Sequence, residues 1–538
     1  MKKSLVPWLL ILAVAAAVRL PALTAGLPYS SYVDENYVLH QVVHLVSDRT
    51  WEPTEYFYPP LTLYLIAAAA TVYSPVYASG HGHPLQEDFS PFPPQYYDIL
   101  EPSELIVVGR LVTLAFSLGI VVLTGVLARR LAGRPAGLAA AWLAALVPAL
   151  VIRGAVVNVN PYVVFFALAT FLFAEGAREG DRPRRDAILA GVMVGLATAC
   201  KYPAGLLCLP VALAVLLSSA SWGEKLRRLV LAGAASAAAT VAANPPLVLR
   251  SGDVLKYMGM QSSFYENIEM GSYWEQAVHR AEWDLPLNHP EVGIVFLILA
   301  AAGLILAFRD RRWARALWGW LLFGIATGAV LASYDFRAFR NLLAFVPLAC
   351  VLIGLLYSTL RQRISRPLWL DLAAAALPVV LFTPALNQYI RHQLALVDSR
   401  EQAIHWLAGH VGPRDKVLVA EEVAFLPSRV ASLGSRTDVQ SWGRAKRRIY
   451  SRRYHYLVLG MPTNPRGGLK IGKTATDEIL EDYSLVAGFG SDITHSHGAN
   501  FRGNQQQVYV LKRKPRPDRV REPAAPPRRG AARRSAAP

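Results

Sequence analysis

Near its N-terminus the chain carries an apolar run, Ser4-Leu-Val-Pro-Trp-Leu-Leu-Ile-Leu-Ala-Val-Ala-Ala-Ala-Val-Arg-Leu20, and fourteen residues beyond it a pair of carboxylates begins, in Tyr32-Val-Asp-Glu-Asn-Tyr37. A further apolar run opens with Tyr58-Pro-Pro-Leu61. A helix needs about 20 predominantly apolar residues to cross a bilayer, so both runs are candidate membrane helices. Carboxylates placed between them lie at the bilayer surface, which indicates chemistry at that surface.

The composition predicts a polytopic membrane protein. Of 538 residues, 53% are apolar and 17% are charged, and the apolar residues form long runs instead of amphipathic stripes. The residues just before Gly26 fit a cleavage site poorly, which favours an uncleaved first helix over a cleavable signal peptide. The apolar runs begin near Ser4, Pro60, Leu105, Pro135, Tyr162, Ala187, Pro203, Val230, Val292, Ala316, Asn341 and Leu368.

Basic residues, with a formal net charge of +17 for the chain, gather in short loops between the apolar runs. This distribution is typical of cytoplasmic loops and gives no indication of nucleic-acid binding. It predicts that loops 25–58, 250–290 and 335–340, and all residues after 387, lie outside. An inside start then requires an odd number of crossings, eleven or thirteen. The clusters are Lys2-Lys3, Arg129-Arg130 with Arg134, Arg178 to Arg185, Lys225 with Arg227-Arg228, Arg309 to Arg315 and Arg361 to Arg366.

The first half of this topology contains a conflict. Three runs, beginning near Pro60, Leu105 and Pro135, separate the outer loop 25–58 from the stretch 153–160, yet both should lie outside. Either one of the three, such as the run from Pro135, is half-length or re-entrant, or one basic cluster breaks the charge rule.

We therefore expect an all-α membrane domain over residues 1–397, a small α/β extracytoplasmic domain over 398–512 and a disordered tail over 513–538. The tail is almost entirely Pro, Ala and Arg, a composition that cannot bury a core and that favours anionic lipid headgroups. In the α/β domain the patterns predict a helix over 401–410 and strands over 416–420, 454–459 and 507–512.

The carboxylates Asp34 and Glu35 open a stretch, Ser31 to Ser47, whose apolar spacing suits a short helix lying in the membrane interface. A carboxylate held there can remove a proton from an acceptor hydroxyl, or hold a divalent cation against a phosphate leaving group. Acidic residues also stabilise the first turn of a helix without any catalytic role. Spacing alone leaves both interpretations open.

Several cations lie at predicted outer boundaries. Lys201 is one, and Arg337 and Arg340 form a second group, with Arg153 as a weaker third. Arginine suits bidentate phosphate binding, so together these side chains predict an anion site near the headgroups. The alternatives are a snorkelling Lys201 and a salt bridge from the arginines to a nearby aspartate. Tyr58 precedes two prolines that start a helix, and its side chain could line a site.

Other polar features are less specific. His81 with His83, and His40 with His44, have spacings that a metal could use, but no supporting ligand pattern accompanies them. The loop 250–290 is rich in aromatic and acidic residues, which suit sugar recognition, although aromatic belts at membrane interfaces are the favoured interpretation.

The order of these features resembles the polyprenyl-phosphate-sugar-dependent glycosyltransferases of the GT-C fold. The nearest branch is the protein O-mannosyltransferase group, with lipid A aminoarabinose transferases as relatives. The resemblance covers roughly residues 1–357. It rests on Val33-Asp-Glu-Asn-Tyr37, Tyr58-Pro-Pro-Leu-Thr-Leu-Tyr64, Gly109-Arg-Leu111, Ala128-Arg-Arg-Leu-Ala-Gly133, Gly195-Leu-Ala-Thr-Ala-Cys-Lys-Tyr202 and Arg340-Asn-Leu-Leu-Ala-Phe-Val-Pro347.

The resemblance implies an integral membrane enzyme of the cytoplasmic membrane. It would move a sugar from a polyprenyl-phosphate donor to a protein, lipid or glycan acceptor at the outer face, commonly inverting the anomeric centre. Asp34 takes the place of the catalytic base, with Glu35 beside it, and Lys201, Arg337 and Arg340 are the cations expected on the carrier phosphate. A divalent cation is left open, and no other cofactor is implied.

Two features depart from the family pattern, and two other function classes remain as alternatives. Cys200 stands where the family often has Thr, and Asn341 where an aromatic residue is common, which leaves the sugar and the acceptor unassigned. A non-catalytic membrane assembly or sensor protein would tolerate loss of Asp34. A transporter would carry an internal repeat or ionisable residues at mid-bilayer, and the sequence shows no convincing repeat.

Overall fold

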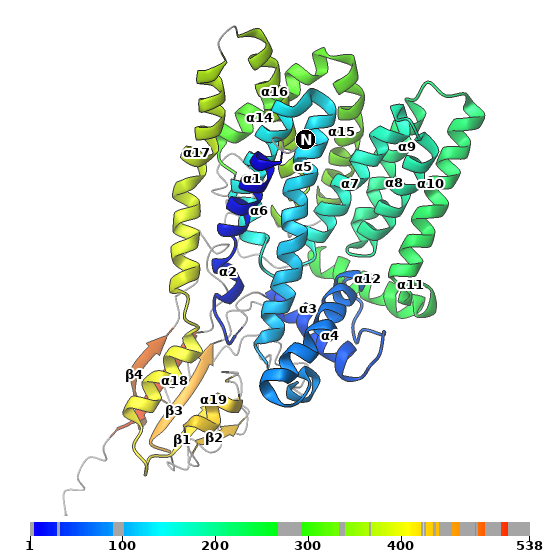
Figure 1. Ribbon diagram of the computed structural model, residues 1–538. Helices are drawn as coiled ribbons and strands as arrows, with labels where there is room; N and C mark the ends of the chain where they lie inside the picture. The colour runs from blue at the N-terminus through cyan, green and yellow to red at the C-terminus, as the bar shows by residue number, and fades with distance from the viewer. Residues whose placement is uncertain are drawn as a thin grey trace, which may run out of the picture. The chain divides into compact units, whose positions relative to one another are not determined.

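The chain forms two compact units, divided between Asp398 and Ser399. The first unit is helical and the second contains a sheet (Figure 1). The computed structural model describes residues 5–29, 33–89, 102–266, 292–332, 339–364, 367–420, 423, 425, 427–433, 437–440, 454–461, 479, 482–489 and 507–514.

The helical unit confirms the predicted polytopic membrane domain. Eight of its described helices are long and apolar enough to cross a membrane, and two shorter apolar helices accompany them. The helices are α1 (Val6–Ala17), α2 (Pro21–Thr24), α3 (Val33–Ser47), α4 (Leu61–His81), η2 (Leu85–Asp88), α5 (Glu104–Leu146), α6 (Pro148–Arg153), α7 (Asn160–Glu179), α8 (Pro183–Thr198), η3 (Tyr202–Leu207), α9 (Cys208–Leu216), α10 (Trp222–Ala243), α11 (Pro246–Leu249), α12 (Ser251–Glu266), α14 (Ile294–Arg309), α15 (Arg311–Ala332), η5 (Phe339–Leu342), α16 (Phe345–Arg363) and α17 (Leu368–Ala395).

The long helix α5 folds back on itself and therefore makes two passes. Its helical conformation breaks at Ala132 and at Gly133, which has a φ of 84° that favours glycine. The two halves then touch through glycines, because a Cβ on Gly125 would lie 2.8 Å from the Gly137 carbonyl oxygen. The run from Pro135 is thus a returning pass, and the basic cluster 129–134 lies at the turn between the two passes.

The conflict in the predicted topology disappears if α4 does not cross the bilayer, and the packing of α4 favours this. Its Leu61 amide donates to the Ala199 carbonyl oxygen at 3.1 Å, and its far end reaches Tyr77. Both halves of α4 belong to one core cluster, to which α5 contributes residues near its beginning, from Leu105 to Val112. We infer that α4 lies along this face beside α3, at the end of α5 where α5 begins (Figure 1).

If α4 does not cross and the 16-residue α8 does, the described helices are arranged for eleven passes; the number of crossings stays a prediction. The eleven passes are α1, the two halves of α5 (the second continued by α6), α7, α8, η3 with α9, α10, α14, α15, α16 and α17. With that number of passes, the loop 25–58 and the stretch 153–160 would lie on the same side, and the basic cluster at the turn of α5 would obey the charge rule.

Helices α8 and α10 pack side by side and run parallel. A Cβ on Gly191 would lie 2.1 Å from the Ala232 carbonyl oxygen, and one on Gly195 would lie 2.5 Å from that of Ser236. In each pair the two residues are separated by 41 positions in the sequence. A constant separation along the contact requires that the two helices run parallel. The absent side chains let the two backbones approach closely.

The second unit is α/β, as predicted. Its mixed sheet has the order β2-β1-β3-β5-β4, with parallel β1–β2 and β1–β3 pairs and antiparallel β3–β5 and β4–β5 pairs. The three predicted strands and the predicted helix are present, whereas β2 and β4, whose residues are largely exposed, were missed. The elements are α18 (Ser399–His410), β1 (Val417–Ala420), α19 (Pro427–Ser432), β2 (Thr437–Gln440), β3 (Tyr456–Met461), β4 (Tyr483–Phe489) and β5 (Gln507–Arg513). The strand β5 includes Arg513, the first residue of the predicted tail, and residues 515–538 lie outside the described residues.

Candidate functional site

Asp34 lies in the first turn of α3 and forms an ion pair with Arg340 of η5. One Asp34 carboxylate oxygen is 3.0 Å from the Arg340 guanidinium nitrogen Nη1. The two side chains are 20% and 32% exposed, so the pair is reachable from solvent. Asp34 therefore begins a helix, as the structural interpretation expects, and also faces a cation from a distant segment, while its catalytic role stays a prediction.

Glu35 points the other way and is fully buried against Arg110 of α5. Two parallel hydrogen bonds of 2.8 and 2.7 Å join the guanidinium to the carboxylate, and both side chains are 0% exposed. Arg110 also donates to the carbonyl oxygens of three residues at the end of the first pass, Ala22, Leu23 and Ala25, while Glu35 accepts from the Val157 amide. The pair thus ties four segments together beneath Asp34.

Lys201 lies in the connection between α8 and η3, where two amide side chains hold its ammonium group. Its Nζ donates to Asn160 Oδ1 at 3.1 Å and to Asn341 Oδ1 at 2.7 Å. Burial and, after it, the nearby Arg340 together lower the pKa of Lys201 to about 8, while Asp34 opposes the change. The ammonium group is therefore partly desolvated, yet no carboxylate hydrogen-bonds to it within the described residues, which suits it to bind an anion.

The other predicted site residues fall in different places. Tyr58 lines the same cavity as Lys201, with its ring 5.7 Å from that of Tyr37. Arg153 ends α6 and lies over the ring of Phe339, 5.7 Å from its centre, one residue before Arg340. Arg337 lies outside the described residues, as does most of the aromatic loop 250–290.

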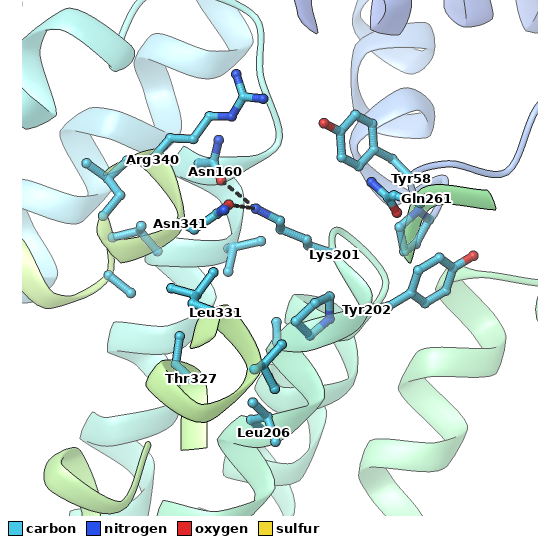
Figure 2. A pocket seen from close by; sticks show the side chains of 18 of the residues that line it. Tyr58, Asn160, Lys201, Tyr202, Leu206, Gln261, Thr327, Leu331, Arg340 and Asn341 are labelled. Carbon is cyan, nitrogen blue, oxygen red and sulfur yellow. Dashed lines mark hydrogen bonds between the residues drawn. The ribbon is translucent and has the colours of Figure 1, made fainter. Parts of the chain in front are cut away.

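A cavity of about 160 Å³ contains the polar cluster at one end and an apolar wall at the other. Figure 2 shows Lys201, Asn160, Asn341 and Arg340 grouped together, with Leu206, Thr327 and Leu331 on the opposite side of the cavity. The apolar wall comes mainly from η3 and α15, and both belong to segments apolar enough for a membrane. An anionic head with an apolar tail fits this gradient.

The described residues contain no group of three or more His, Cys, Asp and Glu side chains placed to hold a metal ion. His81 stacks on Tyr77, and His44 pairs with Asp48, so the predicted histidine spacings form no ligand set there. At the polar cluster the described carboxylate is Asp34, already paired with Arg340. The need for a divalent cation stays a prediction.

Three functional candidates had no assigned role in the sequence. Arg110 was visible as a charge inside an apolar run, and such a charge requires a partner. Asn160 ends the stretch 153–160 that was predicted to lie outside, and Asn341 was noted only as a departure from the family pattern. Their shared hydrogen bonds to Lys201 join segments 41 and 140 residues away from it, a proximity that local spacing cannot reveal.

Comparisons with known proteins agree with this description. Residues 103–248 match the family model for dolichyl-phosphate-mannose-protein mannosyltransferase. No curated relative matches the chain in sequence.

Solved structures share the fold at low identity. The crystal structure of ArnT from Cupriavidus metallidurans bound to undecaprenyl phosphate aligns with a TM-score of 0.57 and 14% identity, covering 93% of this chain and 97% of that one. The apo form of the same protein aligns with a TM-score of 0.54 and 13% identity, and covers the same shares of both chains. The Archaeoglobus fulgidus oligosaccharyltransferase tethered to an acceptor peptide aligns with a TM-score of 0.50 and 13% identity, covering 85% of this chain and 69% of that one. The family match over residues 103–248 and the fold shared with these structures agree with the resemblance, drawn from the sequence, to membrane glycosyltransferases of the GT-C fold.

Proposed function

We propose that the chain transfers a sugar from a polyprenyl-phosphate donor to an acceptor, with Asp34 as the base. The observation that carries this proposal is the Asp34–Arg340 ion pair beside the cavity that Lys201 and Arg340 line. A carboxylate next to two cations supports a base close to a phosphate-binding site.

The donor is inferred from the two ends of the cavity. Lys201 and Arg340 supply positive charge for a phosphate, and the apolar wall formed by residues such as Phe323 and Leu331 suits an isoprenoid chain. The undecaprenyl phosphate named in the ArnT structure has this chemistry, which supports the same class of carrier for this chain.

The reaction follows from these roles as a single inverting displacement. The acceptor oxygen or nitrogen forms a bond to the anomeric carbon while the bond from that carbon to the phosphate oxygen breaks. The acceptor's proton passes to Asp34, and the electron pair leaves with the polyprenyl phosphate, where Lys201 and Arg340 stabilise the new negative charge. One base is sufficient, and no covalent intermediate with the enzyme is needed.

Arg340 has a second task in this scheme. A guanidinium group has five N–H donors, so it can bind Asp34 and a phosphate oxygen at the same time. Arg340 would then fix the distance between the base and the leaving group. Arg153 stacks on Phe339, the residue before Arg340. We assign Arg153 the role of an additional positive charge near the phosphate.

Glu35 is assigned a positioning role, because its carboxylate is buried and occupied by Arg110 and the Val157 amide. Tyr58 is assigned to the substrate-facing wall of the cavity. Arg337, in the same outer connection as Arg340, stays a predicted phosphate ligand. The acceptor, whether protein, lipid or glycan, and the sugar are not distinguished by these residues.

The site is proposed to face the outside of the cell membrane. The basic clusters at the turn of α5 and before α8 and α10 mark the opposite face as cytoplasmic. With eleven passes, the second unit would also lie outside.

Comparing cell-surface glycans by mass spectrometry, in cells with the intact chain and in cells with an Asp34→Asn chain at equal expression, tests the proposed function. We expect one glycan to lose a sugar in the variant, which would name both the sugar and the acceptor. Identical glycans at equal expression would contradict the proposal.

The pH dependence of sugar transfer should report the charge of Lys201. Since burial lowers its pKa to about 8, the free enzyme has the ammonium form below that pH and loses it above. We expect kcat/KM to fall by about tenfold per pH unit above roughly pH 8. Initial rates measured from pH 6 to pH 10 with a labelled lipid-linked donor would show this decline.

Replacing Lys201 by Arg provides the control, because an arginine keeps its charge across this range. The variant should be slower at pH 7, since Arg cannot reproduce both amide contacts, but its alkaline decline should disappear. A decline at the same pH in the Lys201→Arg variant would show that another group titrates.

A further inference from the structure

An arginine-lined hollow lies at the face opposite the proposed active site. Its lining is Arg182, Pro183, Arg184 and Arg185 at the start of α8, with Glu224 and Arg228 from the first two turns of α10. The hollow is open to solvent, with a volume of about 470 Å³. Helix α8, whose 16 residues extend about 24 Å, separates it from Lys201.

A network of ion pairs holds the hollow open. Glu224 accepts three hydrogen bonds from Arg184, of 2.9, 3.1 and 2.7 Å, and a fourth from Arg228 at 3.0 Å. Arg228 donates in addition to the Ala177 carbonyl oxygen at 3.1 Å. These contacts fix two guanidinium groups as walls without using all of their N–H donors.

Positive charge remains in excess after these pairs are formed. Arg185 contacts Asp186, and Arg182 makes no side-chain hydrogen bond or ion pair to any described residue. The four arginines that line the hollow face one lining carboxylate, Glu224, with Asp186 beside them. An anion is therefore the ligand that this hollow favours.

The N-terminal ends of two helices add to the positive charge of the hollow. Because α8 and α10 run parallel, their N-terminal ends open on the same hollow, at Pro183 and Trp222. The N-terminal end of a helix carries about half a positive elementary charge and free N–H groups. Two such ends next to four guanidinium groups make a site for a phosphate group, for which the planar arginine fork is well matched.

The neighbouring surface indicates that the phosphate belongs to a lipid. Ile188 lies one turn along α8 from Arg184, on the same face of the helix, and is 37% exposed. An acyl chain can cover this apolar side chain while the head group occupies the hollow. Basic pockets between membrane helices at the cytoplasmic side bind anionic head groups in this way.

We propose that the hollow between α8 and α10 binds the head group of an anionic phospholipid from the leaflet opposite the active site. Arg182 and Arg185 supply the guanidinium groups that contact the phosphate, while Glu224 holds Arg184 and Arg228 in place. This binding site is separate from the polyprenyl-phosphate cavity and does not depend on the proposed reaction.

Native mass spectrometry of the full chain in detergent, titrated with phosphatidylglycerol or phosphatidylcholine, tests the proposal. The intact chain should retain phosphatidylglycerol in preference to phosphatidylcholine. The double variant Arg182→Gln/Arg185→Gln, which leaves the Glu224 network in place, should bind phosphatidylglycerol about tenfold more weakly or worse. Its thermal unfolding midpoint should match that of the intact chain, because both side chains are exposed.

The matched control removes two exposed arginines from the same face but outside the hollow, in the variant Arg309→Gln/Arg363→Gln. It should retain the lipid as the intact chain does. Equal weakening in both double variants, or no weakening in Arg182→Gln/Arg185→Gln, would overturn the proposal. Displacement of the lipid by millimolar glycerol phosphate would instead assign the hollow to a soluble phosphate and overturn the lipid assignment.

Discussion

Replacing Asp34 by Asn is expected to lower kcat for sugar transfer by about 10²- to 10⁴-fold, the contribution typical of a general base. The amide has nearly the shape of the carboxylate and can still accept a hydrogen bond from Arg340, so the loss should reflect the missing proton acceptor. Affinity for the lipid-linked donor should change little, because Lys201 and Arg340 keep their charges. Single-turnover rates with a labelled donor, together with donor binding at equilibrium, would separate the two effects.

Asp48→Asn is the matched control for this experiment. Asp48 follows the last turn of α3, pairs with His44 and has a side chain that is 60% exposed, far from the cavity lining. Its replacement should leave the rate within about twofold, as surface substitutions away from special features do little. Unchanged transfer in Asp34→Asn membranes would remove Asp34 from catalysis and leave the assembly or sensor alternative in place.

The sequence predicted the convergence of Asp34, Lys201 and Arg340 for a physical reason. Basic loops stay on the cytoplasmic side of a membrane, so the charge pattern predicted that these three residues lie at the outer face, although the count of crossings conflicted in the first half. Three-dimensional proximity then followed from the packing of the helices. The 3.0 Å ion pair between residues 34 and 340 is the most direct result of that argument.

The sequence could not separate the roles of Asp34 and Glu35. Neighbouring residues on a helix point about 100° apart, so one can face a cavity while the other faces the core. Which one does so depends on Arg110, which lies 75 residues from Glu35. The orientation of α4 was unpredictable for a similar reason, because its length and hydropathy fit a crossing and only its packing on α3 and the start of α5 argues against one.

Loss of Arg110 should destabilise the helical unit more than any other single change considered for this chain. Replacing it by Met leaves the Glu35 carboxylate buried without its cation, and breaking a buried ion pair in this way costs about 3–5 kcal/mol. The carbonyl oxygens of Ala22, Leu23 and Ala25 lose their shared donor as well. We expect a lower thermal unfolding midpoint in detergent and poor accumulation in membranes, with transfer lost because α3 no longer holds Asp34 in place.

A double variant distinguishes an uncompensated charge from a simple loss of packing. If the buried charge is the main cost, Glu35→Met combined with Arg110→Met should unfold at a higher temperature than Arg110→Met alone, since apolar pairs can replace a buried ion pair with little loss. The unfolding temperature of Glu35→Met alone should lie between those of Arg110→Met and the double variant. In Glu35→Met, Arg110 keeps its three carbonyl partners, but the Val157 amide loses its acceptor. A double variant less stable than either single variant would show that the pair contributes mainly through its geometry, by fixing the end of the first pass, α3 and the stretch before Asn160 in one arrangement.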